Sequence, residues 1–207
     1  MKVAVTGHTG FIGRNLVRKL ESLGHTVYKI SRDYEKVECD RVYHLACPST
    51  SKYINENPAK IMDIILDGTR SALQICPSAL FINASTKGVL DIDGDQTPQV
   101  SYNLAKRCME TYVRNSGVVY ENYRIPSVYG IDMHDDMYVK RCVDGHAYYP
   151  KEPNKIHHIA HIDEVVDALV ELREIEVEDI TLGEIYELFS SGRRRIYRTT
   201  PDQTTIE

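Results

Sequence analysis

In the first 30 residues, the spacing of apolar positions changes from that of a strand to that of a helix and back to that of a strand. A short apolar run, residues 2–6, leads through a glycine-rich turn into a segment whose apolar residues recur at helical spacing. Gly24 then closes this helix, and residues 26–30 form a second β-rich run. The order of strand, helix and strand predicts a βαβ unit over residues 2–31, with its two strands parallel.

The same alternation continues to about residue 129. Strand-like segments at 41–46, 79–83 and 118–125 alternate with helical patterns at 58–76 and 102–115. This alternation predicts an α/β fold, a Rossmann-type doubly wound parallel sheet with helices on both faces. The helix positions expected in the core are Ile61, Ile64, Ile65, Ala72 and Leu73, then Leu104, Cys108, Met109 and Val113.

The pattern becomes irregular after Tyr129. Two helices stand out there, at residues 163–173 and 182–189. We therefore expect a core over residues 1–130 and a small C-terminal lobe over residues 131–207 that packs partly back on the core.

Composition and charge narrow the class of protein. The 207 residues include 42% hydrophobic and 27% charged side chains, which is typical of a globular domain with a small appendage. A formal net charge of −5 argues against a nucleic-acid partner. No segment predicts a membrane span or a secretory signal, so a cytoplasmic location is expected. One basic run is expected to be a solvated tail: Arg193, Arg194, Arg195 and Arg198.

The turn after the first strand has the glycines that a dinucleotide site needs. Gly7, Gly10 and Gly13 follow a Gly-x-x-Gly-x-x-Gly spacing between the first strand and the first helix. They permit a tight turn, a close approach of the backbone to a pyrophosphate and close helix packing, while free N–H groups at the helix start favour an anion. The sequence predicts a dinucleotide cofactor here, and the alternative is a purely structural turn.

The residues after the second strand bear on the choice between NAD and NADP. An acidic residue at that point binds the ribose 2′-hydroxyl of NAD, whereas an arginine binds the 2′-phosphate of NADP. Arg32, assisted by Ser31, favours NADP. Asp33 favours NAD if the strand extends two residues further, and an exposed Arg32–Asp33 ion pair is the alternative without function.

A tyrosine and a lysine provide candidate acid–base chemistry. Tyr102 and Lys106 are four residues apart, so they share one face of the predicted helix. Tyrosine titrates at about pH 10, and a nearby cation is needed for it to work near neutrality. Such a pair also arises by chance on helix surfaces. Here it follows a strand that ends in Ser85 and Thr86, where a hydroxyl can bind the same substrate oxygen.

Together these residues resemble the extended short-chain dehydrogenase/reductase superfamily, in its NAD-dependent epimerase/dehydratase (nucleotide-sugar) family. The likeness runs along most of the chain and is carried by several motifs in order. Besides the glycine turn and the Tyr102/Lys106 pair, these are His44-Leu45-Ala46, Asn57-Pro58, Asp67-Gly68-Thr69, residues 124–130 and His161 to Val165.

The resemblance implies roles for individual residues. Thr86, Tyr102 and Lys106 would be the catalytic triad, with Lys106 binding the nicotinamide ribose and lowering the pKa of Tyr102. The lobe over residues 131–207 would bind a nucleotide sugar, and helices near 58–76 and 102–115 would form a homodimer. The residues implied to bind the cofactor are Gly7, Gly10, Phe11, Ile12, Gly13, Ser31, Arg32, Leu45, Ala46, Cys47, Tyr102, Lys106, Pro126 and Ser127.

Cysteines and histidines are expected to have no catalytic part. The five cysteines are scattered and lack a CxxC pair, so reduced thiols are expected, with Cys47 and Cys108 inert. His157, His158 and His161 cluster, but no matching Cys or acidic motif accompanies them. A structural or substrate-lobe role is expected for these histidines, and no metal.

The chain departs from the family pattern at several points. Only residues 33–40 stand where family members carry a further strand and helix, and relatives continue beyond Phe189 into a larger lobe. In 4,6-dehydratases the triad threonine is followed by Asp-Glu, whereas Lys87 and Gly88 follow Thr86 here. The sequence therefore predicts an epimerase or ketosugar reductase, with epimerase leading, and not a 4,6-dehydratase. An inactive NAD(P)-binding redox sensor is the alternative, favoured by the shortened lobes and opposed by the complete triad.

Overall fold

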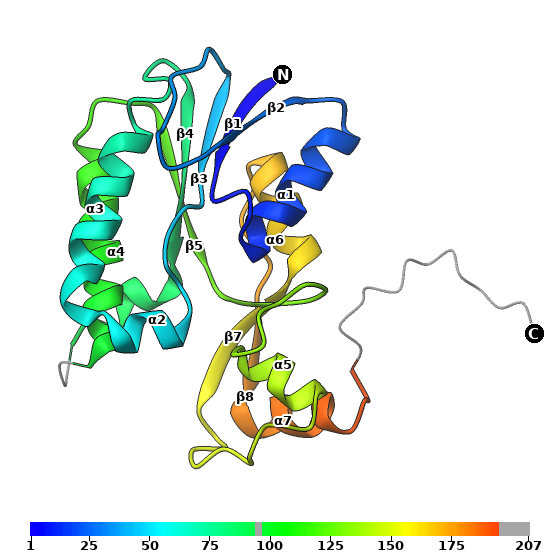
Figure 1. The fold of residues 1–207 in the computed structure, drawn as a ribbon. Helices are drawn as coiled ribbons and strands as arrows, with labels where there is room; N and C mark the ends of the chain where they lie inside the picture. Colours follow the sequence, from blue (N-terminus) through cyan, green and yellow to red (C-terminus); the bar gives the residue numbers. More distant parts are fainter. Residues whose placement is uncertain (94–96, 195–207) are drawn as a thin grey trace, which may run out of the picture.

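The computed structural model describes residues 1–93 and 97–194, and its centre is a parallel β-sheet (Figure 1). The strand order is β2-β1-β3-β4-β5, and each neighbouring pair is parallel. The carboxyl ends of all five strands therefore lie at one edge. The strands are β1 (Lys2–Thr6), β2 (Thr26–Ile30), β3 (Arg41–His44), β4 (Leu80–Thr86) and β5 (Tyr120–Ile125).

Helices cover both faces of this sheet, which confirms the predicted Rossmann-type fold (Figure 1). On one face α1 (Phe11–Ser22) packs against α6 (Ile162–Glu171), and on the other α3 (Ile61–Ala72) packs against α4 (Pro98–Arg114). None of the helices in the described ranges is long and apolar enough to cross a bilayer. Shorter elements complete the second face: α2 (Ser51–Glu56) and the 3-10 turns η1 (Pro58–Lys60) and η2 (Lys87–Leu90).

The predicted buried faces of α3 and α4 are partly wrong. Ile64 and Leu104 are exposed, at 36% and 39%, and Cys108 is only half-buried. Instead, the side chains of Lys106 and Glu110 on α4 are buried. Lys106 donates to a carbonyl oxygen of β4, and Glu110 accepts from an arginine of β5. Hydrophobic periodicity overlooks such a face because it counts only apolar side chains.

Residues 31–40 connect β2 to β3 without a helix or a strand, so the sheet ends at β2, as the short spacing predicts. This connection lies along α3. The Val37 N–H donates to the Ile75 carbonyl oxygen at 3.2 Å, and the Tyr34 hydroxyl lies 3.3 Å from the point where a Cβ on Gly68 would stand. The loop thus contacts both α3, at Gly68, and the segment that follows this helix, at Ile75.

A second, smaller sheet forms the lower part of the molecule in Figure 1. Its strand order is β6-β7-β8, with β6 and β7 parallel and β8 antiparallel to β7. The sequence pattern does not predict these strands, since they are short and partly polar. They are β6 (Ser127–Tyr129), β7 (Ile156–His161) and β8 (Glu178–Thr181), accompanied by α5 (Tyr138–Val143) and α7 (Leu182–Ser190).

One apolar cluster includes side chains from both sheets. It contains Val5 and Leu16 near the central sheet, and Ile159, Leu169 and Phe189 from the later elements. The second sheet therefore shares its core with the first. The division of the chain at residue 130 remains a proposal.

Arg194 contradicts the expectation of a solvated basic tail. Its guanidinium donates to the Glu178 carboxylate and to the Tyr129 hydroxyl, the latter at 2.9 Å, and lies over the rings of Tyr129 and Phe189. The charge is paired and packed against aromatic rings, which holds the end of the described chain to the second sheet. Arg193 is exposed, and Arg195 and Arg198 lie outside the described residues.

Candidate cofactor and active site

The turn between β1 and α1 depends on two glycines. Gly7 has a φ of +69°, and a Cβ there would lie 2.7 Å from the main-chain nitrogen of Ala46. A Cβ on Gly13 would lie 2.1 Å from the Gly7 carbonyl oxygen. Both distances are far inside van der Waals contact. The chain can take this path only because these positions have no side chain.

The start of α1 fits the phosphates of a dinucleotide. Gly10 caps the helix without a side chain, and the first turn contains no acidic residue. The first N–H groups of a helix have no partner within it, and they carry the positive end of its dipole. In the same turn, Nδ1 of His8 is buried without a hydrogen-bond partner. An anion could therefore be bound here by main-chain N–H groups and an imidazole.

The other residues expected around the cofactor lie at the same edge of the sheet. Leu45, Ala46 and Cys47 follow β3, and the Ala46 N–H donates to the Thr6 hydroxyl at 3.2 Å. Pro126 and Ser127, which is exposed, follow β5. Parallel strands bring these segments to one edge.

Phe11 and Ile12 can contribute only through the main chain. The Phe11 side chain is 5% exposed and belongs to the core, with its ring centroid 6.4 Å from that of His134. Ile12 packs against the same apolar cluster. Their N–H groups remain in the first turn of α1, as the glycine motif requires.

Ser31, Arg32 and Asp33 are exposed at the carboxyl end of β2. The strand ends at Ile30, as predicted, so Arg32 is the second residue after it. No described residue forms a hydrogen bond or ion pair with the side chain of Arg32 or Asp33, and the alternative of an ion pair between them is not realised. Both remain open to a ligand.

Tyr102 and Lys106 are buried together on α4, at 8% and 4% exposure. The Lys106 ammonium donates to the Ala84 carbonyl oxygen at 2.8 Å and lies 5.9 Å from the centroid of the Tyr102 ring. The prediction that the two side chains share a helix face is confirmed. The hydrogen bond to β4 fixes where the lysine lies relative to the sheet.

The pKa of Tyr102 is raised in this structure, opposite to the lowering expected from Lys106. Burial is the main cause, and the neighbouring Cys47 thiol raises the pKa further. The Lys106 ammonium, 5.9 Å from the centroid of the Tyr102 ring, is not among the groups that shift this pKa. Cys47, expected to be inert, lies near the candidate acid–base residue, and its thiol donates to the Pro48 carbonyl oxygen at 3.4 Å.

Thr86 is the last residue of β4, and in the sheet register it is paired with Ile125 on β5. Its hydroxyl oxygen accepts a hydrogen bond from the Gly88 N–H at 3.2 Å, which leaves the hydroxyl hydrogen available for another acceptor. Ser85 is buried instead, because neighbouring side chains point to opposite faces of a strand. Of the two hydroxyls, that of Thr86 is the more accessible.

His44 belongs to a buried hydrogen-bond chain between β1, β3 and α3. The Thr69 hydroxyl donates to the Ile65 carbonyl oxygen at 2.8 Å, so it must accept from Nε2 of His44, 3.2 Å away. Nδ1 of His44 then accepts from the Thr6 hydroxyl at 2.9 Å. Burial, and next the charge of Lys106, lower the pKa of His44 to about 3. The ring is therefore neutral and structural.

A pair of residues that the sequence analysis missed ties α4 to β5. Glu110 accepts two hydrogen bonds from Arg124, at 3.0 and 2.8 Å. Burial raises the pKa of Glu110, but the hydrogen bonds from Arg124 and the nearby Ser85 hydroxyl, together with the charges of Arg124 and Arg107, outweigh burial and lower the pKa. A signal was present, because Tyr102, Lys106 and Glu110 recur every four residues on one helix face.

Two of the three clustered histidines have structural partners. His158 pairs with Asp179 across β7 and β8 at 2.5 Å, and Nδ1 of His161 accepts from the Asp163 N–H at the start of α6. Within residues 1–93 and 97–194, no group of three His, Cys, Asp or Glu side chains is placed to hold a metal ion.

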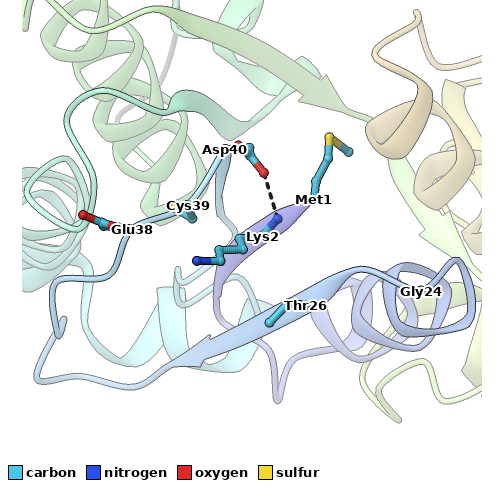
Figure 2. Close-up of a pocket in the computed structure, with 7 residues that line it drawn as sticks. All are labelled: Met1, Lys2, Gly24, Thr26, Glu38, Cys39 and Asp40. Atoms are coloured by element: carbon cyan, nitrogen blue, oxygen red, sulfur yellow. Dashed lines mark hydrogen bonds between the residues drawn. The ribbon is translucent and has the colours of Figure 1, made fainter.

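An open hollow lies at the opposite edge of the central sheet (Figure 2). The Lys2 N–H donates to the Asp40 carboxylate there at 2.8 Å. The hollow adjoins the amino ends of β1, β2 and β3, whereas the candidate site residues follow the carboxyl ends. Its lining residues are Met1, Lys2, Gly24, Thr26, Glu38, Cys39 and Asp40.

Comparison with protein families and curated proteins identifies similar sequences. The model of the NAD dependent epimerase/dehydratase family matches residues 3–174. UDP-glucuronic acid decarboxylase 3 of Arabidopsis thaliana is 25% identical over 227 residues, a match that covers 84% of this chain and 66% of that protein. The chain thus spans less than two thirds of the length of this relative.

Solved structures share the fold at low identity. UDP-glucose 4-epimerase of Thermus thermophilus, in complex with NAD, has a TM-score of 0.73 at 18% identity, covering 92% of this chain and 83% of that one. A double mutant of the dTDP-glucose 4,6-dehydratase DesIV of Streptomyces venezuelae also has a TM-score of 0.73, at 16% identity, covering 93% and 81%. The two match equally well, so the predicted exclusion of a dehydratase is unsupported.

Replacing Gly13 with alanine should disrupt the turn. The new Cβ would meet the Gly7 main chain at 2.1 Å, and we expect a loss of about 2–3 kcal/mol in the free energy of unfolding, measured by urea titration. Gly68→Ala is the matched control, since its Cβ would meet only the end of the Tyr34 side chain. Equal stabilities for the two variants would contradict the close approach.

Acidification should destabilise the protein through His44. The folded-state pKa of about 3 lies below the ordinary value of 6.5, so the unfolded chain takes up the proton first, and stability falls as pH drops from 6.5 towards 3. Between about pH 6 and 4, wild type should lose about 1.4 kcal/mol per pH unit more than His44→Gln. His146→Gln, at an exposed position, should keep the wild-type slope. Identical slopes for wild type and His44→Gln would disprove this assignment.

Proposed function

The chain belongs to the NAD-dependent epimerase/dehydratase family, and from this membership we propose that it is an NAD(P)-dependent enzyme that oxidises a ring carbinol of a nucleotide sugar. The observation that carries the proposal is the buried Tyr102/Lys106 pair on α4, beside the carboxyl ends of β3 and β4. A tyrosine and a lysine buried together at that edge are well suited to move a proton and to hold a ribose.

The chain would hold the cofactor along the carboxyl edge of the sheet. The N–H groups of Phe11, Ile12 and Gly13 would bind the pyrophosphate, and Lys106 would bind the nicotinamide ribose. When bound, the nicotinamide supplies the acceptor and donor of hydride. The remaining contacts would come from Leu45, Ala46, Cys47, Pro126 and Ser127, with Ser31 and Arg32 at the adenosine ribose.

Tyr102 would take the proton of the substrate hydroxyl while Thr86 orients the same oxygen. Thr86 suits this role because its hydroxyl hydrogen is not used within the fold. Burial raises the pKa of Tyr102, which favours the protonated form that returns a proton to the substrate oxygen. For the oxidation step, in which Tyr102 takes the proton, its pKa must fall, and Lys106 is the cation that shares its helix face.

The candidate activities differ in which substrate is offered and in where the hydride goes. Return of hydride to the other face of the sugar would make the chain an epimerase, which we favour, and reduction of a supplied ketosugar would make it a reductase. Decarboxylation is a second candidate, favoured by the similarity to a UDP-glucuronic acid decarboxylase. Oxidation two carbons from the carboxylate would give a β-keto acid, which loses carbon dioxide readily.

The surroundings of the site suggest how the protein is organised. The outer faces of α3 and α4 expose Ile64, Leu104 and Tyr112, which supports a homodimer through these helices. The lobe over residues 131–207 would bind the nucleotide sugar, with exposed Tyr148 and Tyr149 available for stacking. The five free thiols support a cytoplasmic location.

Tyr102→Phe tests the proposed chemistry. Removal of the phenol should lower kcat by about 10²- to 10⁴-fold on a substrate that wild type converts. UDP-glucose and UDP-glucuronic acid are offered with NAD or NADP, and products are followed by NMR. Tyr112→Phe, on the exposed face of the same helix, is the matched control and should retain activity. Unchanged turnover by Tyr102→Phe would refute the mechanism, and cofactor binding without any conversion would favour a redox sensor.

Arg32→Ala tests the choice of cofactor. A guanidinium can bind a 2′-phosphate through two charge-assisted hydrogen bonds, so wild type should prefer NADP by about ten- to a hundredfold. The variant should lose most of this preference and keep its NAD affinity, as measured by calorimetry. Lys36→Ala, in the same exposed loop, should leave the preference intact. If wild type binds NAD more tightly than NADP, Asp33 and not Arg32 would be the residue that contacts the adenosine ribose.

A further inference from the structure

Two cysteines that are far apart in the sequence meet beside the amino-terminal edge of the central sheet. Cys39 lies at the end of the loop between β2 and β3, and Cys76 follows α3. The Cys76 thiol lies 3.4 Å from the Cys39 carbonyl oxygen, which brings the two residues into direct contact. Neither residue belongs to the proposed active site, which lies at the other edge.

The main chain holds the two cysteines in place from both sides. On one side the Val37 N–H donates to the Ile75 carbonyl oxygen at 3.2 Å, and on the other the Leu80 N–H donates to the Asp40 carbonyl oxygen at 3.1 Å. The segments that carry the thiols are therefore fixed next to each other. Disulfide formation requires such proximity without a backbone rearrangement.

The two thiols differ in character. Burial raises the pKa of Cys76, but hydrogen bonds with Cys39, Ser78 and Ala79 outweigh burial and lower it. Burial and the neighbouring Cys76 raise the pKa of Cys39 to about 12. Cys76 is thus the better nucleophile at neutral pH. Cys39 lines the open hollow (Figure 2), and both cysteines are only half-buried.

We infer that Cys39 and Cys76 are a redox-active pair that forms a reversible disulfide on exposure to a small disulfide such as glutathione disulfide. The Cys76 thiolate attacks one sulfur of glutathione disulfide, forms a mixed disulfide and releases one glutathione thiolate. Cys39 then loses its proton and attacks the Cys76 sulfur, releasing the second glutathione. In total two protein thiols are oxidised, and one glutathione disulfide is reduced to two glutathione molecules.

The cross-link would fasten the loop over residues 31–40 to the end of α3. The loop is otherwise held there by the Val37 hydrogen bond and by Tyr34 against Gly68. Closing a ring between Cys39 and Cys76 reduces the freedom of the unfolded chain. We expect the melting temperature to rise by roughly 5–10 °C on oxidation.

Mass spectrometry of the full chain, incubated with glutathione disulfide, tests the inference. Wild type should lose two hydrogens and yield a digest peptide that joins Cys39 to Cys76, and dithiothreitol should reverse both changes. Cys39→Ser should retain one glutathione on Cys76, because the second thiol is missing. Cys76→Ser should leave Cys39 largely unmodified, because Cys39 stays protonated.

Cys108→Ser is the matched control, since it removes a half-buried thiol on α4 and should cross-link like wild type. Wild type that keeps glutathione on Cys76 without the cross-link would overturn the inference. A cross-link through other cysteines, or no change in mass, would overturn it as well. These wild-type measurements need no variant, so the outcome does not depend on whether a substituted chain folds.

Discussion

The contact between the end of β1 and the end of β3 is the constraint on which the rest of the molecule depends. Gly7 passes so close to Leu45 and Ala46 that no side chain fits between them, and Gly13 brings α1 against the same turn. The Thr6 hydroxyl bridges the two strand ends by accepting from the Ala46 N–H and donating to His44. The position of α1, and with it the anion-binding start of that helix, follows from this contact.

Much of the central sheet could be predicted from sequence because its signals are local. The apolar run of residues 2–6, the spaced glycines and Gly24 each act over a few residues, and β1, α1 and β2 appear at the expected positions. Tyr102 and Lys106 share a face because helix geometry requires it. The strands of the second sheet could not be predicted, since β6 gains its pairing only from β7, about 30 residues away.

The errors have a common physical cause. Periodicity assigns the buried face of a helix by counting apolar residues, so it placed Leu104 in the core and left Lys106 and Glu110 out of it. In the structure Leu104 is exposed and Lys106 and Glu110 are buried, because Lys106 donates to a carbonyl oxygen and Glu110 accepts from a guanidinium on the sheet. Satisfied polar groups can be buried at modest cost, and they fix one orientation of α4. The same bonds that orient the helix therefore orient the candidate catalytic tyrosine.

The packing of α6 on α1 has a consequence for synthesis of the chain on the ribosome. The apolar face of α1, which includes Leu16 and Leu20, shares its cluster with Val165 and Leu169, about 150 residues later. The first βαβ unit thus emerges with one face of its helix uncovered, and that face is buried only after α6 has been made. Cotranslational folding of the amino-terminal half cannot reach its final packing before most of the chain has left the exit tunnel.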